Sequence, residues 1–217
     1  MRSLWFSLIL VTIGLSSLQA QDPLRFEQEI EQLKKKSFST SAEGPKLVFA
    51  GSSSIRMWTD LEAAFPEHRV INMGFGGSQM SDLLYFLPDL VIRHQPERVY
   101  IYEGDNDLAD EKSIKEVMAN TNAVIAALRA SLPGVQIYFI SPKPSISRWN
   151  LRKKYVKLNK QLDKLCAKYK DLSFIDVWNP MLTPDGKLRP DLFIEDGLHM
   201  TADGYAIWQA QIKPFLP

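Results

Sequence analysis

The chain has 217 residues, 45% of them hydrophobic and 24% charged, a composition typical of one globular domain with a sizeable core. Its 26 basic side chains nearly balance its 25 acidic ones, which argues against nucleic-acid binding and against an electrostatic membrane patch. Cys166 is the only cysteine, so the chain has neither a disulfide framework nor a thiolate metal cluster. Because Cys166 has helical spacing with several leucines, we expect it to be a buried helix residue.

The first twenty residues have the layout of a secretory signal peptide. Arg2 precedes an apolar run at 4–15, and small residues then lead to a plausible cleavage site after Ala20. A membrane anchor is the alternative, but about a dozen apolar residues are too few to span a bilayer comfortably. We therefore expect residues 1–20 to be removed and residues 21–217 to form an exported domain without a membrane span, either periplasmic or extracellular.

Helical and strand patterns alternate along the rest of the chain. A first helix is expected after the capping residue Asp22 and Pro23, with Phe26, Ile30 and Leu33 on one face. Five short apolar runs predict strands at 46–51, 68–74, 98–104, 135–141 and 172–178. Further helical patterns lie at 56–64, 78–93, 111–131, 149–170 and 202–212. Strands that are apolar throughout and alternate with helices predict one α/β domain, a three-layer α/β/α structure with a five-stranded parallel sheet.

Small and polar residues follow each predicted strand, where ligands bind in open parallel sheets. The first four strands are followed by GSSS, GFGGS, EGDND and SPKPS, and EDGLH lies in the long loop after the fifth. We expect these five loops to converge at one edge of the sheet and to form the functional site.

His199 is the candidate base because it alone among the three histidines belongs to that edge. His68 starts the second strand at the opposite edge, and His94 lies near a helix C-terminus, where positive charge suits the helix dipole. Asp196 precedes His199 by three residues, so a short loop can place a carboxylate beside the imidazole, as the base of a nucleophilic serine requires. A structural histidine beside an ordinary turn is the competing interpretation.

Gly77 and Asn106 are candidate donors for a developing oxyanion, through a backbone N–H and a side-chain amide respectively. The glycines also fit turns or a phosphate-binding helix N-terminus, but GFGGS matches neither a dinucleotide nor a P-loop fingerprint. The segment DNDLADE lacks the glycine and the closing glutamate of a calcium loop. We predict no metal and no cofactor.

Together, the blocks GSSSIRMW, NMGFGGS, GDND and DGLH resemble the SGNH (GDSL-type) hydrolases from about residue 46 to the C-terminus, most closely the bacterial branch related to platelet-activating-factor acetylhydrolase subunits. The resemblance implies a flavodoxin-like SGNH hydrolase fold. It also implies Ser53 as nucleophile, the Ser53 N–H, Gly77 and Asn106 as oxyanion donors, and Asp196 with His199 as the acid–base pair. Residue 52 is Ser where the family more often has Asp, and a shift of one residue makes Ser54 the alternative nucleophile.

These inferences predict a secreted serine esterase that removes a small acyl group, notably acetyl, from a glycan or lipid ester without a nucleic-acid partner. An α/β-hydrolase is disfavoured because Ile55 stands where the nucleophile elbow of that fold needs glycine. A non-catalytic glycan- or lipid-binding pseudoenzyme is the alternative, and a flavodoxin-like cofactor carrier explains neither the Asp–His pair nor the export signal. Four large side chains are either pocket-lining or core residues: Trp58, Phe75, Met80 and Trp149. The oligomeric state is left open.

Overall fold

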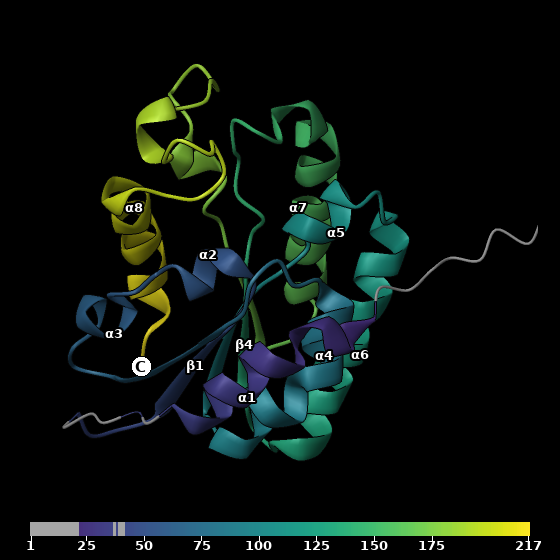
Figure 1. Ribbon diagram of the computed structural model, residues 1–217, viewed down its shortest axis with the longest axis vertical. Helices are drawn as coiled ribbons and strands as arrows, with labels where there is room; N and C mark the ends of the chain where they lie inside the picture. Colours follow the sequence, from purple (N-terminus) through teal and green to yellow (C-terminus); the bar gives the residue numbers. More distant parts are fainter. Residues whose placement is uncertain (1–21, 37, 39–41) are drawn as a thin grey trace, which may run out of the picture.

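The computed structural model of the chain describes residues 22–36, 38 and 42–217, so the predicted signal peptide lies outside the described residues. Five parallel strands form a single sheet in the order β2-β1-β3-β4-β5, with helices on both faces (Figure 1). The strands are β1 (Lys46–Gly51), β2 (Arg69–Gly74), β3 (Arg98–Tyr102), β4 (Gln136–Ile140) and β5 (Leu172–Ile175). The predicted three-layer α/β/α architecture is confirmed.

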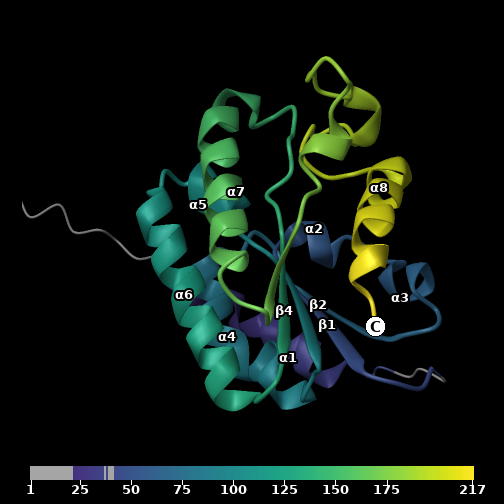
Figure 2. The same ribbon diagram turned by 180° about the vertical axis from the view of Figure 1, so that it is seen from behind.

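The sheet separates two apolar cores because successive strand residues point to opposite faces. Val48 and Ala50 belong to the core covered by α1 (Glu27–Lys35), α4 (Met80–Leu90) and α6 (Ile114–Ser131). Leu47 and Phe49 belong to the core on the other face, which α2 (Ser53–Arg56), α3 (Leu61–Ala64) and α8 (Ala202–Ile212) cover. Helix α7 (Arg152–Cys166) packs beside α6 and β5 (Figure 2).

The helix predicted over 56–64 is wrong, because two shorter helices replace it. Helix α2 begins at Ser53, and the buried side chain of Asn72 interrupts the helical pattern by donating to the carbonyl oxygens of Ile55 (2.9 Å) and Trp58 (3.1 Å). Gly74 allows α2 to lie directly on β2, since a Cβ at this position would come within 2.2 Å of the Arg56 nitrogen. The segment that begins at Ser53 is thereby fixed against the second strand.

The other helices follow the predicted pattern with shifted ends. All but α8 lose a first or last turn to a 3₁₀ helix or a loop, as in η1 (Pro23–Phe26) before α1, η2 (Ile92–His94) after α4 and η3 (Trp149–Leu151) before α7. A short helix that the sequence did not reveal, α5 (Asp105–Ala109), follows β3. Helix α8 has the predicted bounds, with Thr201 as its N-cap, and three 3₁₀ turns, η4 (Asn179–Met181), η5 (Pro190–Leu192) and η6 (Lys213–Phe215), complete the structure.

Cys166 is buried near the end of α7, as its helical spacing predicts. Burial raises the pKa of its thiol to about 12, so the thiolate is strongly disfavoured at neutral pH. The residue therefore behaves as a small apolar side chain.

Replacing Asn72 by Ala should lower the free energy of unfolding by about 2–4 kcal/mol, because the side chain makes three buried hydrogen bonds, the third from Gly74 N–H to Oδ1. Urea unfolding monitored by circular dichroism measures the change. The matched control is Asn122→Ala, since Asn122 is exposed on α6 and its side chain donates only to Met118, and its loss should change stability by less than about 0.5 kcal/mol. Equal effects of the two substitutions would contradict the assigned role of Asn72.

Candidate active site

The order of the strands brings three of the predicted loops together. Strand β1 lies between β2 and β3, and Gly51 at its end pairs in register with Gly74 and with Tyr102. The segments that carry Ser53, Gly77 and Asn106 therefore leave the sheet side by side.

Ser53, His199 and Asp196 form a continuous chain of hydrogen bonds. The Nε2 atom of His199 lies 2.8 Å from Ser53 Oγ, and its Nδ1 atom lies 2.5 Å from Asp196 Oδ2. Ser54, the alternative nucleophile, is buried beneath this contact, and its carbonyl oxygen accepts a hydrogen bond from Tyr205. The hydroxyl that the imidazole contacts thus belongs to Ser53.

The carboxylate of Asp196 is held by its own loop. Its Oδ1 atom accepts the backbone N–H groups of Leu198 (2.8 Å) and His199 (2.9 Å), while Oδ2 contacts the imidazole. Desolvation on its own would raise the pKa of Asp196, but these hydrogen bonds and the His199 side chain lower it to about 2. The group facing the histidine is therefore an ionised carboxylate at neutral pH.

Gly77 and Asn106 stand on either side of the β1 loop. Gly77 is exposed, has a φ of +73°, and has no atom within 4 Å of the position a Cβ would occupy, so its backbone is open to a ligand. The side-chain nitrogen of Asn106 donates to the carbonyl oxygen of Ser78 (2.8 Å), and its oxygen accepts from Arg148 (2.9 Å). Asn106 is thus tied to the residue that follows Gly77.

Two buried acids lie behind this loop. Ser78 Oγ donates to Glu103 (2.6 Å), and the Asp107 carboxylate accepts the backbone N–H of Met80. Burial, together with the charge of Asp107, raises the pKa of Glu103 well above its ordinary range. Burial also raises the pKa of Asp107 to about 6, against the opposing effects of the Met80 N–H and Lys112. The glycine loop therefore rests on two acidic side chains that ionise less readily than exposed carboxyl groups.

A second buried cluster, around Asp105, was missed by the sequence analysis. Asp105 contacts the side chains of Tyr102, Lys143, Arg148 and Tyr155, and Lys143 is fully buried. The sequence did carry a signal for this cluster: Lys143 and Arg148 follow the fourth strand, and an acidic segment follows the third. Nothing in the sequence paired them with particular carboxylates.

The N-terminal helix also contributes a contact that sequence reasoning did not identify. Both carboxylate oxygens of Glu29 lie 3.1 Å from the backbone nitrogen of Gly76, which donates to them, and Arg56 Nη1 lies 3.3 Å from Oε1. Phe26, one turn earlier, packs edge-on against Phe75 with the ring centroids 5.1 Å apart. Helix α1 thereby holds the glycine loop at Gly76, while Asn106 holds it at Ser78.

The remaining candidates have structural roles. Trp58, Phe75 and Met80 are buried in the two cores, and half-buried Trp149 stacks on Trp178, so the first three serve mainly in packing. Burial, with the charges of Arg93 and Lys46, lowers the pKa of His94, contrary to the positive charge expected from the helix dipole. His68 lies just before β2, at the opposite edge of the sheet from the triad.

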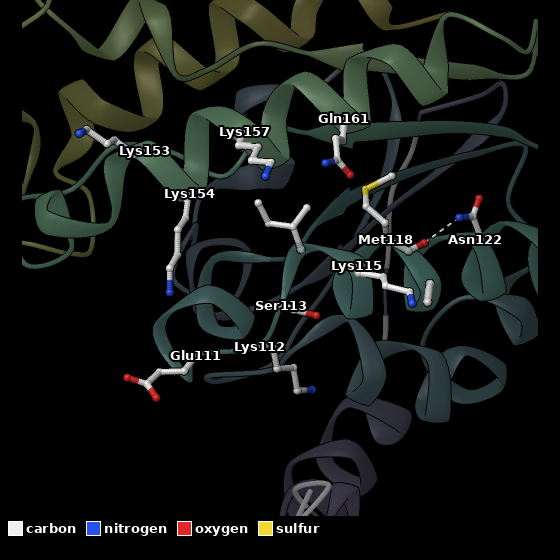
Figure 3. A pocket seen from close by; sticks show the side chains of 12 residues that line it. Glu111, Lys112, Ser113, Lys115, Met118, Asn122, Lys153, Lys154, Lys157 and Gln161 are labelled. Atoms are coloured by element: carbon white, nitrogen blue, oxygen red, sulfur yellow. Dashed lines mark hydrogen bonds between the residues drawn. The ribbon is translucent and has the colours of Figure 1, made fainter.

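A groove of about 940 Å³ between α6 and α7 lies apart from these residues (Figure 3). Its walls carry Lys115 on α6 and Lys153, Lys154 and Lys157 on α7, and it contains none of the predicted site residues. Within residues 22–36, 38 and 42–217, no group of three His, Cys, Asp or Glu side chains is arranged to hold a metal ion. Nor is any helix of this described part long and apolar enough to cross a membrane.

Replacing Asp107 by Asn should flatten the pH dependence of stability. Between about pH 4 and about pH 6 the unfolded chain releases a proton that folded Asp107 retains, since its pKa is about 6 in the fold against 3.8 ordinarily. Relative to the Asn variant, the wild type should therefore lose about 2–3 kcal/mol of stability as the pH rises through this range. Urea titrations at several pH values measure the difference, and parallel curves for both proteins would contradict it.

Comparison with known proteins assigns this chain to a family. Residues 39–207 match the model of the GDSL-like lipase/acylhydrolase family. No curated protein sequence matches the chain. Its fold is similar to that of a platelet-activating-factor protein from Streptococcus pneumonia, at 21% identity over 89% of this chain and 92% of that one, with a TM-score of 0.77.

Two further solved structures share the fold. A GDSL-like lipase from Bacteroides thetaiotaomicron is 22% identical over 89% of this chain and 96% of its own, with a TM-score of 0.71. An acetylxylan esterase from Geobacillus stearothermophilus is 18% identical over 81% and 95% of the two chains, with a TM-score of 0.65. The family match spans most of the chain and includes the Ser53 and His199 loops, so this protein belongs to the GDSL-like lipase/acylhydrolase family and is a carboxylic ester hydrolase.

Proposed function

We propose that this protein is an exported serine esterase that removes a small acyl group, notably acetyl, from a glycan or lipid ester through an acyl-enzyme. The observation that carries the proposal is the hydrogen-bonded chain from Ser53 through His199 to Asp196. The apolar run at 4–15 supports export, and the acetylxylan esterase with the same fold supports a small acyl group on a glycan.

The geometry suits proton transfer from Ser53. When Nδ1 of His199 carries a hydrogen and donates it to ionised Asp196, Nε2 is left with the lone pair that accepts the Ser53 proton. The Ser53 oxygen then attacks the ester carbonyl, the carbon–oxygen bond to the alcohol breaks, and imidazolium protonates the departing alcohol. Water, deprotonated by His199, repeats the sequence on the acyl-enzyme and releases the acid.

Three donors are proposed to stabilise the oxyanion: the Ser53 N–H, the Gly77 N–H and the Asn106 side chain. An amide nitrogen carries two hydrogens, so Nδ2 of Asn106 keeps one for the substrate while the other bonds Ser78. Losing one such donor costs about 10²–10³ in turnover, which is the effect we expect for Asn106→Ala.

Hydrolysis of p-nitrophenyl acetate by the purified protein tests the proposal, with Ser53→Ala beside Ser54→Ala. We expect Ser53→Ala to lower kcat by a factor on the order of 10⁶, as for serine nucleophiles generally, and Ser54→Ala to keep most of the activity. A fluorophosphonate probe should label the wild type and Ser54→Ala but not Ser53→Ala. A wild type that is neither labelled nor faster than Ser53→Ala would favour the non-catalytic binding protein.

Two measurements of kcat/KM test the substrate class. One compares acetyl with octanoyl esters, and the other compares acetylated xylooligosaccharides with an acetylated phospholipid. The proposal expects the acetyl ester to have the higher kcat/KM, because a small acyl group is its central claim. A higher kcat/KM for the octanoyl ester would contradict the proposal and indicate a lipase.

Glu29→Ala should lower kcat by about 3- to 10-fold, less than the loss of a whole oxyanion donor, because the carboxylate only holds the Gly76–Gly77 turn from behind. KM should change by less than about 2-fold, since Glu29 contacts no substrate in this mechanism. Glu29→Gln keeps an acceptor for the Gly76 N–H, so its kcat should lie between those of the wild type and Glu29→Ala. Glu31→Ala on the same helix removes only an exposed pairing with Lys34 and serves as the control.

A further inference from the structure

Two adjacent residues of the segment after β4 contact both halves of the site. The backbone N–H of Ser147 donates to the carbonyl oxygen of Gly197 (3.0 Å), in the turn between Asp196 and His199. The guanidinium of Arg148 donates through Nη2 to the side-chain oxygen of Asn106 (2.9 Å). Ser147 and Arg148 therefore link the His199 loop to the side chain of Asn106.

Arg148 is itself held at a second point. Its Nη1 atom bonds Asp105, which is buried and also accepts the hydroxyls of Tyr102 and Tyr155 and faces buried Lys143. Burial would raise the pKa of Asp105, but the two cations and two hydroxyls hold it well below its usual range. A permanently charged carboxylate thus fixes the guanidinium that contacts Asn106.

The contact with Arg148 determines how the Asn106 amide is oriented. A guanidinium has only donors and a backbone carbonyl has only an acceptor. The amide oxygen must therefore face Arg148, while the amide nitrogen faces the Ser78 carbonyl. A charge-assisted bond to the amide oxygen also draws electron density from the nitrogen, which makes its N–H groups stronger donors.

We propose that Arg148 is a positioning residue for ester hydrolysis, which holds and polarises the Asn106 amide so that its free N–H meets the oxyanion, while adjacent Ser147 keeps this amide in register with the His199 loop. The inference rests on the proposed role of Asn106. It also gives a function to Asp105, which anchors Arg148 and contacts none of the three triad residues through a hydrogen bond in the described structure.

A double-mutant cycle on p-nitrophenyl acetate hydrolysis tests the proposal, using Arg148→Met, Asn106→Ala and the combination. Arg148→Met should lower kcat by about 10-fold or more, approaching the effect of losing the donor, with KM changed by less than about 2-fold. In the Asn106→Ala background the same substitution should lower kcat by less than about 2-fold, because the group through which Arg148 acts is gone. An equal fold loss in both backgrounds means a purely structural role and overturns the proposal.

Controls separate this outcome from damage to the fold and from failure of the proposed function. Arg152→Met makes the same substitution at an exposed arginine on the first turn of α7, whose contacts are to Trp149, and should change kcat by less than about 2-fold. Arg148→Lys keeps a cation beside Asp105 and enters the same cycle if Arg148→Met does not fold. Arg148→Lys should keep the stability of the wild type. It should still lower kcat by most of the factor seen for Arg148→Met, because lysine lacks the second, directed donor that reaches Asn106.

The cycle also distinguishes this inference from the esterase mechanism. If Ser53→Ala abolishes hydrolysis but Asn106→Ala has no effect on kcat, the serine mechanism stands and the role of Arg148 falls. If the wild type does not hydrolyse the ester at all, both fail.

Discussion

The hydrogen bond between Ser53 and His199 joins side chains 146 residues apart, and much of the fold can be understood as what keeps its two ends in place. One end is set by the sheet, because Ser53 follows a central strand and begins a helix packed on Gly74. The other end lies on a loop with little regular structure, where Asp196 fixes the imidazole through its own backbone and side-chain contacts. The position of Ser53 is thus set by the sheet, whereas that of His199 depends on contacts within its own loop.

Buried charge holds the Asn106 side of the site, at a cost in stability. Removing a carboxylate such as Asp105 from water is unfavourable, and its ion pairs repay the cost only when the remaining lone pairs are also satisfied. Two tyrosine hydroxyls satisfy them here. The acids behind the glycine loop differ from Asp105, since burial raises the pKa of Glu103 and of Asp107, whereas the pKa of Asp105 is lowered. The charged cluster contacts the Asn106 amide through Arg148, whereas Glu103 and Asp107 accept hydrogen bonds from Ser78 and Met80.

The sequence was sufficient to predict the architecture, because continuous apolar runs predict buried parallel strands. Polar residues just after the strands predict where loops converge, and the structure does bring Ser53, His199 and Asp196 into hydrogen-bond contact. Their catalytic roles stay a prediction. The helix at 56–64 was mispredicted because its interruption comes from Asn72, a residue of a different strand. Periodicity within a segment carries no information about such a contact.

The supporting residues escaped prediction for the same physical reason. Arg148, Lys143 and Glu29 are charged side chains whose partners lie far away in the sequence, and only those long-range partners give them a place beside the site. Ser52 is an instructive contrast, since the family more often has Asp there. The Ser52 N–H donates to the Tyr102 carbonyl (3.1 Å) and its own carbonyl accepts from Ile55 and Arg56, so backbone bonds hold the loop without that carboxylate.

Substrate selection must come from the loops rather than from the cores. The large side chains that were candidates for a pocket, Trp58 and Phe75 among them, are fully enclosed and are needed for packing. Exposed apolar side chains do occur beside the triad: Ile146 is 44% exposed and packs against Gly197, and Ile194 is 40% exposed with its N–H bonded to the His199 carbonyl. Both belong to segments that also hold the catalytic geometry. Changing the ester that such a site accepts therefore requires substitutions in segments that also position His199. Specificity is consequently coupled to turnover more tightly than it would be in a pocket built from strand residues.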